Sequence, residues 1–203
     1  MSDICKIGVL GGSFDPVHAG HLNIARTAAQ KLQLDKVLLI PVGISPYKDK
    51  CCCASADNRL EMLSIAVRNE ALLSVSSLEV DSPQVSYTVR TIEKLCEIYP
   101  QAQLYFIIGA DAFCKIFSWY MADVLIRSVR FAVFNRGNVD ITVCAEQVAS
   151  CGGEVFPLHC PHTPVSSSEI RSWFCDIEAN LPLIRKFVHN DVISYILENH
   201  IYP

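Results

Sequence analysis

An apolar run, a pair of glycines and a helical pattern follow one another directly near the start of the chain. The run covers Ile4 to Leu10, and the next residues read Gly11-Gly12-Ser13-Phe14-Asp15-Pro16-Val17-His18-Ala19-Gly20-His21. In α/β proteins, a strand, a glycine turn and a helix in this order bring backbone N–H groups and the positive end of a helix dipole up to a phosphate. The rings of His18 and His21, one helical turn apart, add donors aimed the same way. The segment therefore predicts a nucleotide-phosphate site in an α/β fold.

Apolar runs of strand length recur along the chain and alternate with helical patterns. The expected strands are Lys6–Leu10, Lys36–Pro41, Leu73–Glu79, Leu104–Ile108, Arg130–Phe134 and Glu154–Pro157. Apolar stripes mark two of the helices, one with Leu22, Ala25, Ala29 and Leu32 and the other with Val89, Ile92, Cys96 and Tyr99. Ser86 or Thr88 would cap the second, and Asp57 would start another. This order predicts a Rossmann-like, doubly wound parallel sheet with helices on both faces.

The C-terminal part of the chain has a purely helical pattern. We expect three helices here: one at Ser167–Cys175, one that begins near Pro182, and one at His189–His200. The core stripe of the last is Val192, Ile193, Ile196 and Leu197. No repeat or linker interrupts the sequence, so we expect one α/β domain over residues 1–203, with 165–203 as its helical part. The segment Val42–Ala56 is too long for a plain turn and is predicted to be a mobile lid, whereas Arg136–Asp140 is predicted to be a turn.

The charge balance excludes one class of function. Lys and Arg number 17 against 21 Asp and Glu, a net charge of −4. A protein that relies on bulk basicity to bind nucleic acid would be positive, so no nucleic-acid partner is expected. The start of the chain is not typical of a signal peptide, and no run approaches the ~18 apolar residues that span a membrane. We therefore expect a cytoplasmic protein with no membrane partner, while its oligomeric state, a homo-oligomer included, stays open.

Cysteine is abundant but not arranged for disulfides or metal. The ten cysteines stand at 5, 51, 52, 53, 96, 114, 144, 151, 160 and 175. They form no C-x-x-C pair, and a core of this size does not need disulfides, so most are expected to be reduced. Neither Cys160 with His162 nor the triple Cys51-Cys52-Cys53 has zinc-ligand spacing, so no metal site built by the protein is expected. The triple cysteine instead predicts an exposed, oxidisable loop.

A second segment adds to the predicted phosphate site. Val165-Ser166-Ser167-Ser168-Glu169-Ile170-Arg171 offers hydroxyls and amides at a helix start, with an arginine about one turn later. Alone it also fits a capping box between Ser166 and Glu169. The glycine pair alone fits an ordinary turn, and His18 with His21 fits a zinc pair, although the glutamate of an H-E-x-x-H motif is missing. Together the two segments indicate two helix starts on either side of one triphosphate.

The two segments resemble the nucleotidyltransferase superfamily, whose marks are an H-x-G-H motif and a serine-rich segment followed by arginine. Within it, the chain is most similar to bacterial nicotinate-nucleotide adenylyltransferases, through SYTVRTIEKL at 86–95, FIIGAD at 106–111, Ser118-Trp119-Tyr120, Phe134-Asn135-Arg136 and DVISYILENHIY at 191–202. The resemblance covers nearly the whole length in the same order. It implies that ATP and nicotinate mononucleotide react to give nicotinate adenine dinucleotide and pyrophosphate, in NAD biosynthesis, by direct in-line attack without a covalent enzyme intermediate.

The resemblance also implies roles for single residues. The catalytic residues would be His18, His21 and Arg171. His18 and His21 would hold the α- and β-phosphates, and Ser167 and Arg171 would bind the ATP phosphates. Backbone groups of the glycine turn would line the phosphate path: Gly11, Gly12, Ser13 and Phe14. Mg²⁺ would be carried by the ATP phosphates and would need few protein ligands.

The remaining implied roles concern the mononucleotide. Lys48 and Arg136 would contact its phosphate, Asp111 would lie near the ribose, and Trp119 would stack on the pyridine ring. Backbone N–H groups near Thr88 and Tyr120 would meet the pyridine carboxylate. Each has a plain alternative, because aromatic residues often only pack, a loop lysine is usually solvated, and Asp111 fits a helix cap.

Two departures from the family pattern concern the predicted lid and turn. Tyr47 stands where the family usually has a histidine before the lid lysine, and Gly137-Asn138 stands where Pro-Gly is common.

Three alternatives to this function stay open. The acceptor could be phosphopantetheine or another substrate of the superfamily, the amide mononucleotide could replace the acid, and the fold could serve a non-catalytic nucleotide sensor.

Overall fold

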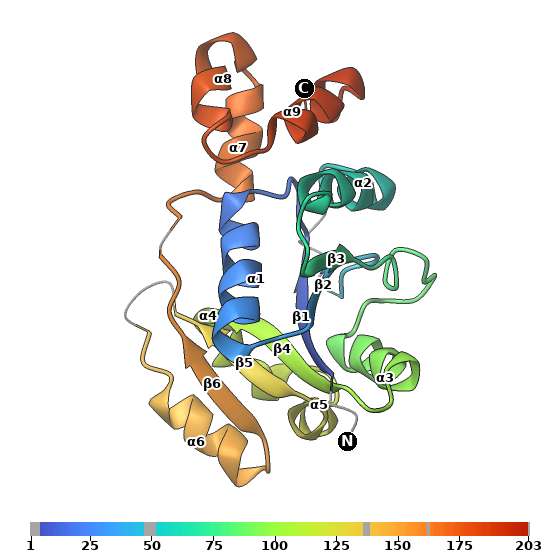
Figure 1. Cartoon of the computed structure of the whole chain (residues 1–203), viewed down its shortest axis with the longest axis vertical. Helices are drawn as coiled ribbons and strands as arrows, with labels where there is room; N and C mark the ends of the chain where they lie inside the picture. The colour runs from blue at the N-terminus through green and yellow to red at the C-terminus, as the bar shows by residue number, and fades with distance from the viewer. Residues whose placement is uncertain (1–4, 47–51, 136–138, 162, 203) are drawn as a thin grey trace.

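Six parallel strands form the central sheet of the computed structural model, which describes residues 5–46, 52–135, 139–161 and 163–202 (Figure 1). Their order across the sheet is β3-β2-β1-β4-β5-β6. The strands are β1 (Lys6–Gly12), β2 (Lys36–Pro41), β3 (Leu73–Val75), β4 (Gln103–Gly109), β5 (Arg130–Phe134) and β6 (Glu154–Leu158). This is the predicted Rossmann-like, doubly wound arrangement, and it is confirmed.

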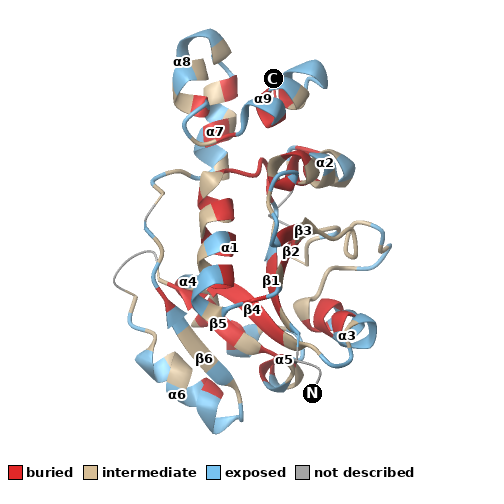
Figure 2. Cartoon of the chain, viewed as in Figure 1, coloured by how far each residue is buried: buried red, intermediate tan, exposed pale blue. Residues whose placement is uncertain are grey.

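Helices pack on both faces of the sheet, and alternate residues of each strand supply the two cores. In β1, Val9 belongs to one buried cluster and Leu10 to the other. The Leu10 side packs against α1 (Ala19–Leu32), α2 (Ala56–Val67), α7 (Ser167–Phe174), α8 (Ile177–Ile184) and α9 (Asn190–Glu198). The Val9 side packs against α3 (Thr88–Ile98), α4 (Ala110–Phe113), the 3-10 turn η1 (Ile116–Ser118), α5 (Ala122–Ser128) and α6 (Thr142–Ser150). Figure 2 shows the central strands as the most continuously buried part of the chain.

The run Leu104–Ile108 is buried throughout, as its lack of polar alternation predicts. The strand expected over Leu73–Glu79 is shorter than predicted. It ends at Val75 because the chain turns away after Ser76, and the N–H of Asp81 donates to the carbonyl of Ser77 at 2.8 Å.

Details of four helices also differ from expectation. In α3, Leu95 is buried and Cys96 is exposed, and Tyr87, in place of Ser86 or Thr88, precedes the helix without a side-chain cap. In α2, Ser55 is the cap in place of Asp57. Pro182 lies inside α8, which begins earlier because Asp176 caps it, and Leu197 of α9 is 44% exposed.

The chain changes direction across the sheet between β1 and β4. From β1 it passes through β2 to β3 on one side, and then crosses to β4, β5 and β6 on the other. In such sheets a crevice forms at the carboxyl ends of the two strands at this switch point, and ligands bind there. Here those ends are Gly12 and Gly109.

The C-terminal helices lie beyond this same end of the sheet. In Figure 1, α7 begins beside the start of α1, with α8 and α9 further out. Within the residues that the structure describes, no helix combines the length and the apolar character needed to cross a bilayer.

Candidate functional site

A cavity of about 510 Å³ opens at the carboxyl ends of β1 and β2, with Phe106 of β4 in its wall. Three segments far apart in sequence line it: the glycine turn Gly11–Ser13, the start of α3 at Ser86–Thr88, and the residues after η1 at Ser118–Tyr120. The structure thus brings together the predicted positions Gly11, Gly12, Ser13, Thr88, Trp119 and Tyr120 around one hollow.

Aromatic rings form one wall of this cavity. The rings of Tyr87 and Tyr120 lie 4.5 Å apart, and the guanidinium of Arg90 lies 5.6 and 5.7 Å from their centres. Trp119 packs edge-on against Phe106 of β4, with ring centres 6.1 Å apart. Trp119 is therefore held by the core on one side while it lines the cavity.

A buried carboxyl group also lines the cavity. Glu79 accepts a hydrogen bond from the Thr91 hydroxyl at 2.7 Å. Burial raises the pKa of Glu79, although hydrogen bonds from Thr91, Ser86 and the Gly43 N–H act in the opposite direction.

A second, smaller hollow of about 60 Å³ lies on the other side of the start of α1. It is lined by His18, Gly20 and Ile24, by Phe134 and Asn135 after β5, and by Cys160, Pro161, Thr163 and Val165. Two side chains of α1 hold the last segment, because Asn23 donates to the Thr163 hydroxyl at 3.2 Å and Thr27 to the Cys160 sulfur at 3.5 Å. This wall is not predictable from the sequence, because the segment has no regular sequence pattern.

His18 and His21 lie at the start of α1 with ring centres 3.8 Å apart. His18 is the helix cap, and its Nδ1 accepts the Gly20 N–H at 3.1 Å. The Nδ1 of His21 in turn accepts the His18 N–H at 3.3 Å. A neutral ring whose Nδ1 accepts carries its proton on Nε2, so both rings act as Nε2–H donors.

Gly20 is required by the position of the His18 ring. A Cβ on Gly20 would lie 2.9 Å from Cε1 and 3.0 Å from Nδ1 of His18. The first distance is one that real Cβ atoms essentially never show and the second is tighter than most Cβ contacts, so the ring would have to move. The glycine of the H-x-G-H motif therefore fixes where the first imidazole lies.

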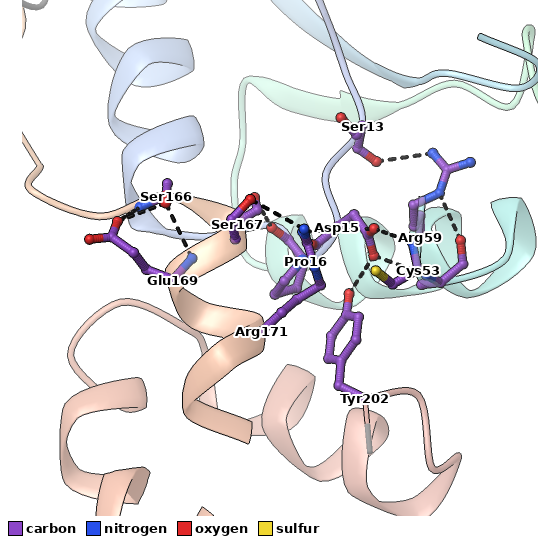
Figure 3. A network of polar contacts seen from close by, with 12 residues as sticks. Ser13, Asp15, Pro16, Cys53, Arg59, Ser166, Ser167, Glu169, Arg171 and Tyr202 are labelled. Atoms are coloured by element: carbon purple, nitrogen blue, oxygen red, sulfur yellow. Dashed lines mark hydrogen bonds and ion pairs between the residues drawn. The ribbon is translucent and has the colours of Figure 1, made fainter. Parts of the chain in front are cut away.

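The start of α7 is attached directly to the chain before α1, and Figure 3 shows these contacts. The Ser167 hydroxyl donates to the Pro16 carbonyl at 3.0 Å, and Arg171 Nη1 donates to the Asp15 carbonyl at 2.6 Å. The capping box between Ser166 and Glu169 forms as well, which bears out the local interpretation of the serine segment. Both helix starts therefore meet at residues 15–16, as the sequence predicts for one shared site.

Two buried charged residues hold the glycine turn, and the sequence analysis identified neither role. Arg59 is 2% exposed and donates to the carbonyls of Ser13, Val42 and Ala54 at 3.0, 2.7 and 3.3 Å. Asp15 is 3% exposed, and its carboxylate accepts hydrogen bonds from the N–H groups of Cys53 and Ala54 at 2.6 and 3.1 Å. These bonds fix the loop between β1 and α1 to the chain before α2.

Comparison with known proteins identifies the family. Residues 9–172 match the family model described as cytidylyltransferase-like. A probable nicotinate-nucleotide adenylyltransferase of Desulfitobacterium hafniense (strain Y51) is 36% identical over 97% of this chain and 95% of its own length. The relative of that name from Carboxydothermus hydrogenoformans is 35% identical over 97% of this chain and 98% of its own.

The chain belongs to the nicotinate-nucleotide adenylyltransferase family.

Solved structures agree on the fold. The Plasmodium falciparum nicotinic acid mononucleotide adenylyltransferase, complexed with NaAD, superposes with a TM-score of 0.80 at 23% identity, covering 98% of this chain and 97% of that one. A putative nicotinate-nucleotide adenylyltransferase from Vibrio parahaemolyticus gives a TM-score of 0.61 at 22% identity, covering 98% and 95%. The family predicted from the sequence is confirmed.

Among the described residues, five positions implied by the family resemblance line neither hollow: Phe14, His21, Asp111, Ser167 and Arg171. Asp111 is exposed in the first turn of α4, where Gly109 is the cap, so the alternative of Asp111 as the helix cap is wrong. Lys48 and Arg136 lie outside the described residues, as do Tyr47, Cys51, Gly137, Asn138 and His162. Cys53 is exposed and Cys52 partly so. Among the described positions, no three His, Cys, Asp or Glu side chains gather as a metal site would need.

Proposed function

We propose that this member of the nicotinate-nucleotide adenylyltransferase family joins ATP and nicotinate mononucleotide, giving nicotinate adenine dinucleotide and pyrophosphate. The observation that carries the proposal is the position of the His18–His21 pair. It lies at the start of α1, where His18 lines the smaller hollow, and the preceding glycine turn lines the large cavity at the switch point of the sheet. Two nucleotides bound on either side would bring their phosphates together at the pair.

The mononucleotide occupies the 510 Å³ cavity in this proposal. Trp119 stacks on the pyridine ring, and Ser13 and Thr88 contact the nucleotide through their backbone. The start of α3 favours an acid over an amide, because a helix N-terminus attracts a carboxylate and Tyr87 provides no side-chain cap there. Lys48, Asp111, Tyr120 and Arg136 complete the proposed mononucleotide site.

ATP takes the other side. The adenosine lies against the hollow between α1 and Thr163, and the triphosphate runs past the two histidines toward Ser167 and Arg171. Backbone groups of Gly11, Gly12, Ser13 and Phe14 line the path between the two substrates. Arg171 donates to the Asp15 carbonyl and the Ser168 hydroxyl. A guanidinium has five N–H donors, so donors remain for a phosphate.

The reaction follows from this placement. A phosphate oxygen of the mononucleotide attacks the α-phosphorus of ATP in line, the bond to the bridging oxygen breaks, and pyrophosphate leaves with the electron pair. The attacking oxygen is already anionic near neutral pH, so no general base and no covalent enzyme intermediate is needed. The residues act by positioning two anions and by donating hydrogen bonds to the charge that builds up on the leaving group.

Mg²⁺ fits this site as a cation carried by the ATP phosphates. The described residues offer no protein cluster for it, and Mg²⁺ usually keeps several waters and binds through substrate phosphates. When bound, it neutralises phosphate charge. The cytoplasm, where thiols stay reduced, suits a chain with ten cysteines.

The test measures pyrophosphate release with ATP and Mg²⁺ and one of three acceptors in parallel: nicotinate mononucleotide, nicotinamide mononucleotide or phosphopantetheine. We expect release mainly with the nicotinate acceptor, because the α3 start recognises its carboxylate. Preferential release with another acceptor would contradict the proposed substrate. Absence of release with all three would contradict the enzymatic function and favour a nucleotide sensor.

A further inference from the structure

The penultimate residue of the chain reaches the loop that leads into α1. Tyr202 is 8% exposed, and its hydroxyl donates to Asp15 Oδ1 at 2.7 Å (Figure 3). Burial, together with this bond, raises the pKa of the Tyr202 hydroxyl, so it remains a proton donor throughout the physiological range. The contact joins residues 187 positions apart and is one of the side-chain bonds that fix the Asp15 carboxylate.

Asp15 also touches the proposed ATP-binding arginine. Arg171 Nη1 donates to the Asp15 carbonyl at 2.6 Å and lies 3.9 Å from the Asp15 carboxylate oxygen Oδ2. The carboxylate therefore has a cation beside it, but it accepts its hydrogen bonds from the Tyr202 hydroxyl and from the N–H groups of Cys53 and Ala54. Asp15 is also only three residues before His18. A shift of Asp15 would therefore affect both the Arg171 guanidinium and the His18 ring.

Tyr202 contacts the arginine's own helix as well. Its ring packs against Phe174 of α7, with ring centres 5.6 Å apart. One side chain thus contacts α7 through its ring and the loop before α1 through its hydroxyl. This is the junction where Ser167 and Arg171 meet residues 15–16.

We infer that Tyr202 is a positioning residue for ATP, acting through Asp15 to keep Arg171 directed at the phosphates. The inference rests on the proposed function. A buried carboxylate that loses one of its donors takes a replacement from the nearest cation. Arg171 Nη1 already pairs loosely with the carboxylate, 3.9 Å from Oδ2, and loss of the Tyr202 donor would draw it into a direct hydrogen bond there. A guanidinium held in that way is less able to bind the triphosphate.

Tyr202→Phe removes the hydroxyl and keeps the ring on Phe174. The chain supplies a matched control, because the Tyr195 hydroxyl donates to Asn58 Oδ1 at 3.1 Å and joins α9 to α2 without touching Asp15 or Arg171. Tyr195→Phe therefore removes one tyrosine hydrogen bond of the same C-terminal segment. A purely structural role predicts the same behaviour for both variants.

The experiment compares steady-state kinetics and calorimetric binding of a non-hydrolysable ATP analogue for wild type and both variants. For Tyr202→Phe we expect the KM for ATP and the Kd of the analogue to rise about tenfold, the scale for a lost hydrogen bond to a charged group. The KM for the mononucleotide should stay within about twofold. Tyr195→Phe should leave all three constants within about twofold.

A Tyr202→Phe variant that binds the analogue as wild type does would overturn the inference. Equal losses in the two variants, matched by equal falls in Tm, would also overturn it, because they would indicate general loosening of the C-terminal segment. Wild-type protein that binds the analogue but releases no pyrophosphate would contradict the proposed function, while the Kd comparison would still decide the role of Tyr202. Wild-type protein that binds no analogue would contradict both.

Discussion

Gly20→Ala adds one methyl group beside the His18 ring, and its effects on activity and stability should differ. The added Cβ would lie 2.9 Å from Cε1 of His18, whereas ordinary contacts begin at about 3.4 Å, so the ring must retreat by about 0.5 Å. The same movement stretches the 3.1 Å hydrogen bond from the Gly20 N–H to Nδ1. The perturbation therefore acts on the first imidazole of the H-x-G-H motif without removing any functional group.

The size of the expected effect follows from the tolerance of catalytic sites. Productive geometry must be held to within about 0.5 Å, and a displacement of about 1 Å is associated with a loss of about 100-fold. We expect kcat to fall about 10-fold or more, which corresponds to roughly 1.4 kcal/mol of transition-state stabilisation. Alanine is favoured over glycine in a helix by up to about 1 kcal/mol, which offsets the cost of displacing the His18 ring. The free energy of unfolding should therefore stay close to that of wild type.

The assay is pyrophosphate release under saturating substrates, with thermal unfolding measured on the same samples. A double-mutant cycle with His18→Ala tests whether Gly20→Ala acts through the His18 ring. If the methyl group acts by displacing the ring, Gly20→Ala has little further effect on kcat once the ring is gone. The reasoning would be refuted if Gly20→Ala lowered kcat by the same factor in wild type and in His18→Ala. A Gly20→Ala variant with the kcat of wild type would refute it as well.

Three further predictions use the same preparations. His18→Ala should lower kcat at least ~100-fold, the scale for one transition-state donor, and a near-normal rate would contradict the proposed mechanism. The variant should still fold, although loss of the α1 cap lowers the free energy of unfolding by about 1 kcal/mol. Trp119→Ala should raise the KM for the mononucleotide, and an effect confined to ATP would show that the ring does not stack on the pyridine. Burial and the neighbouring Cys144 thiol raise the pKa of Cys114, so less of it is thiolate at pH 8 and iodoacetamide should label it more slowly than exposed Cys53. Mass spectrometry of partial alkylation checks this, and equal labelling rates would contradict it.

Features that depend on neighbouring residues could be predicted from the sequence. The capping box between Ser166 and Glu169 spans three positions, and the buried strand Leu104–Ile108 is visible as one apolar run. The parallel sheet with helices on both faces follows from the alternation of strands and helices. Because both helix starts are local signals at the carboxyl ends of strands, their meeting at one site could also be anticipated.

Features that depend on distant backbone groups could not be predicted. Arg59 donates to Ser13 across 46 positions, and Tyr202 reaches Asp15 across 187. No spacing rule connects such pairs, since the acceptors are carbonyl groups or a carboxylate that the fold alone brings near. The hollow beside Thr163 was missed for a related reason, because the irregular segment at its wall is placed by hydrogen bonds from α1.

The central claim is that two nucleotides bind at once on opposite sides of the His18–His21 pair and react directly. The most direct measurement is the stereochemistry of the reaction with ATP made chiral at the α-phosphorus by a single sulfur. One in-line displacement inverts the configuration at that phosphorus, and inversion in the dinucleotide product is the predicted result. Retention would require two displacements through an adenylylated residue of the enzyme, and it would contradict direct transfer between the two hollows.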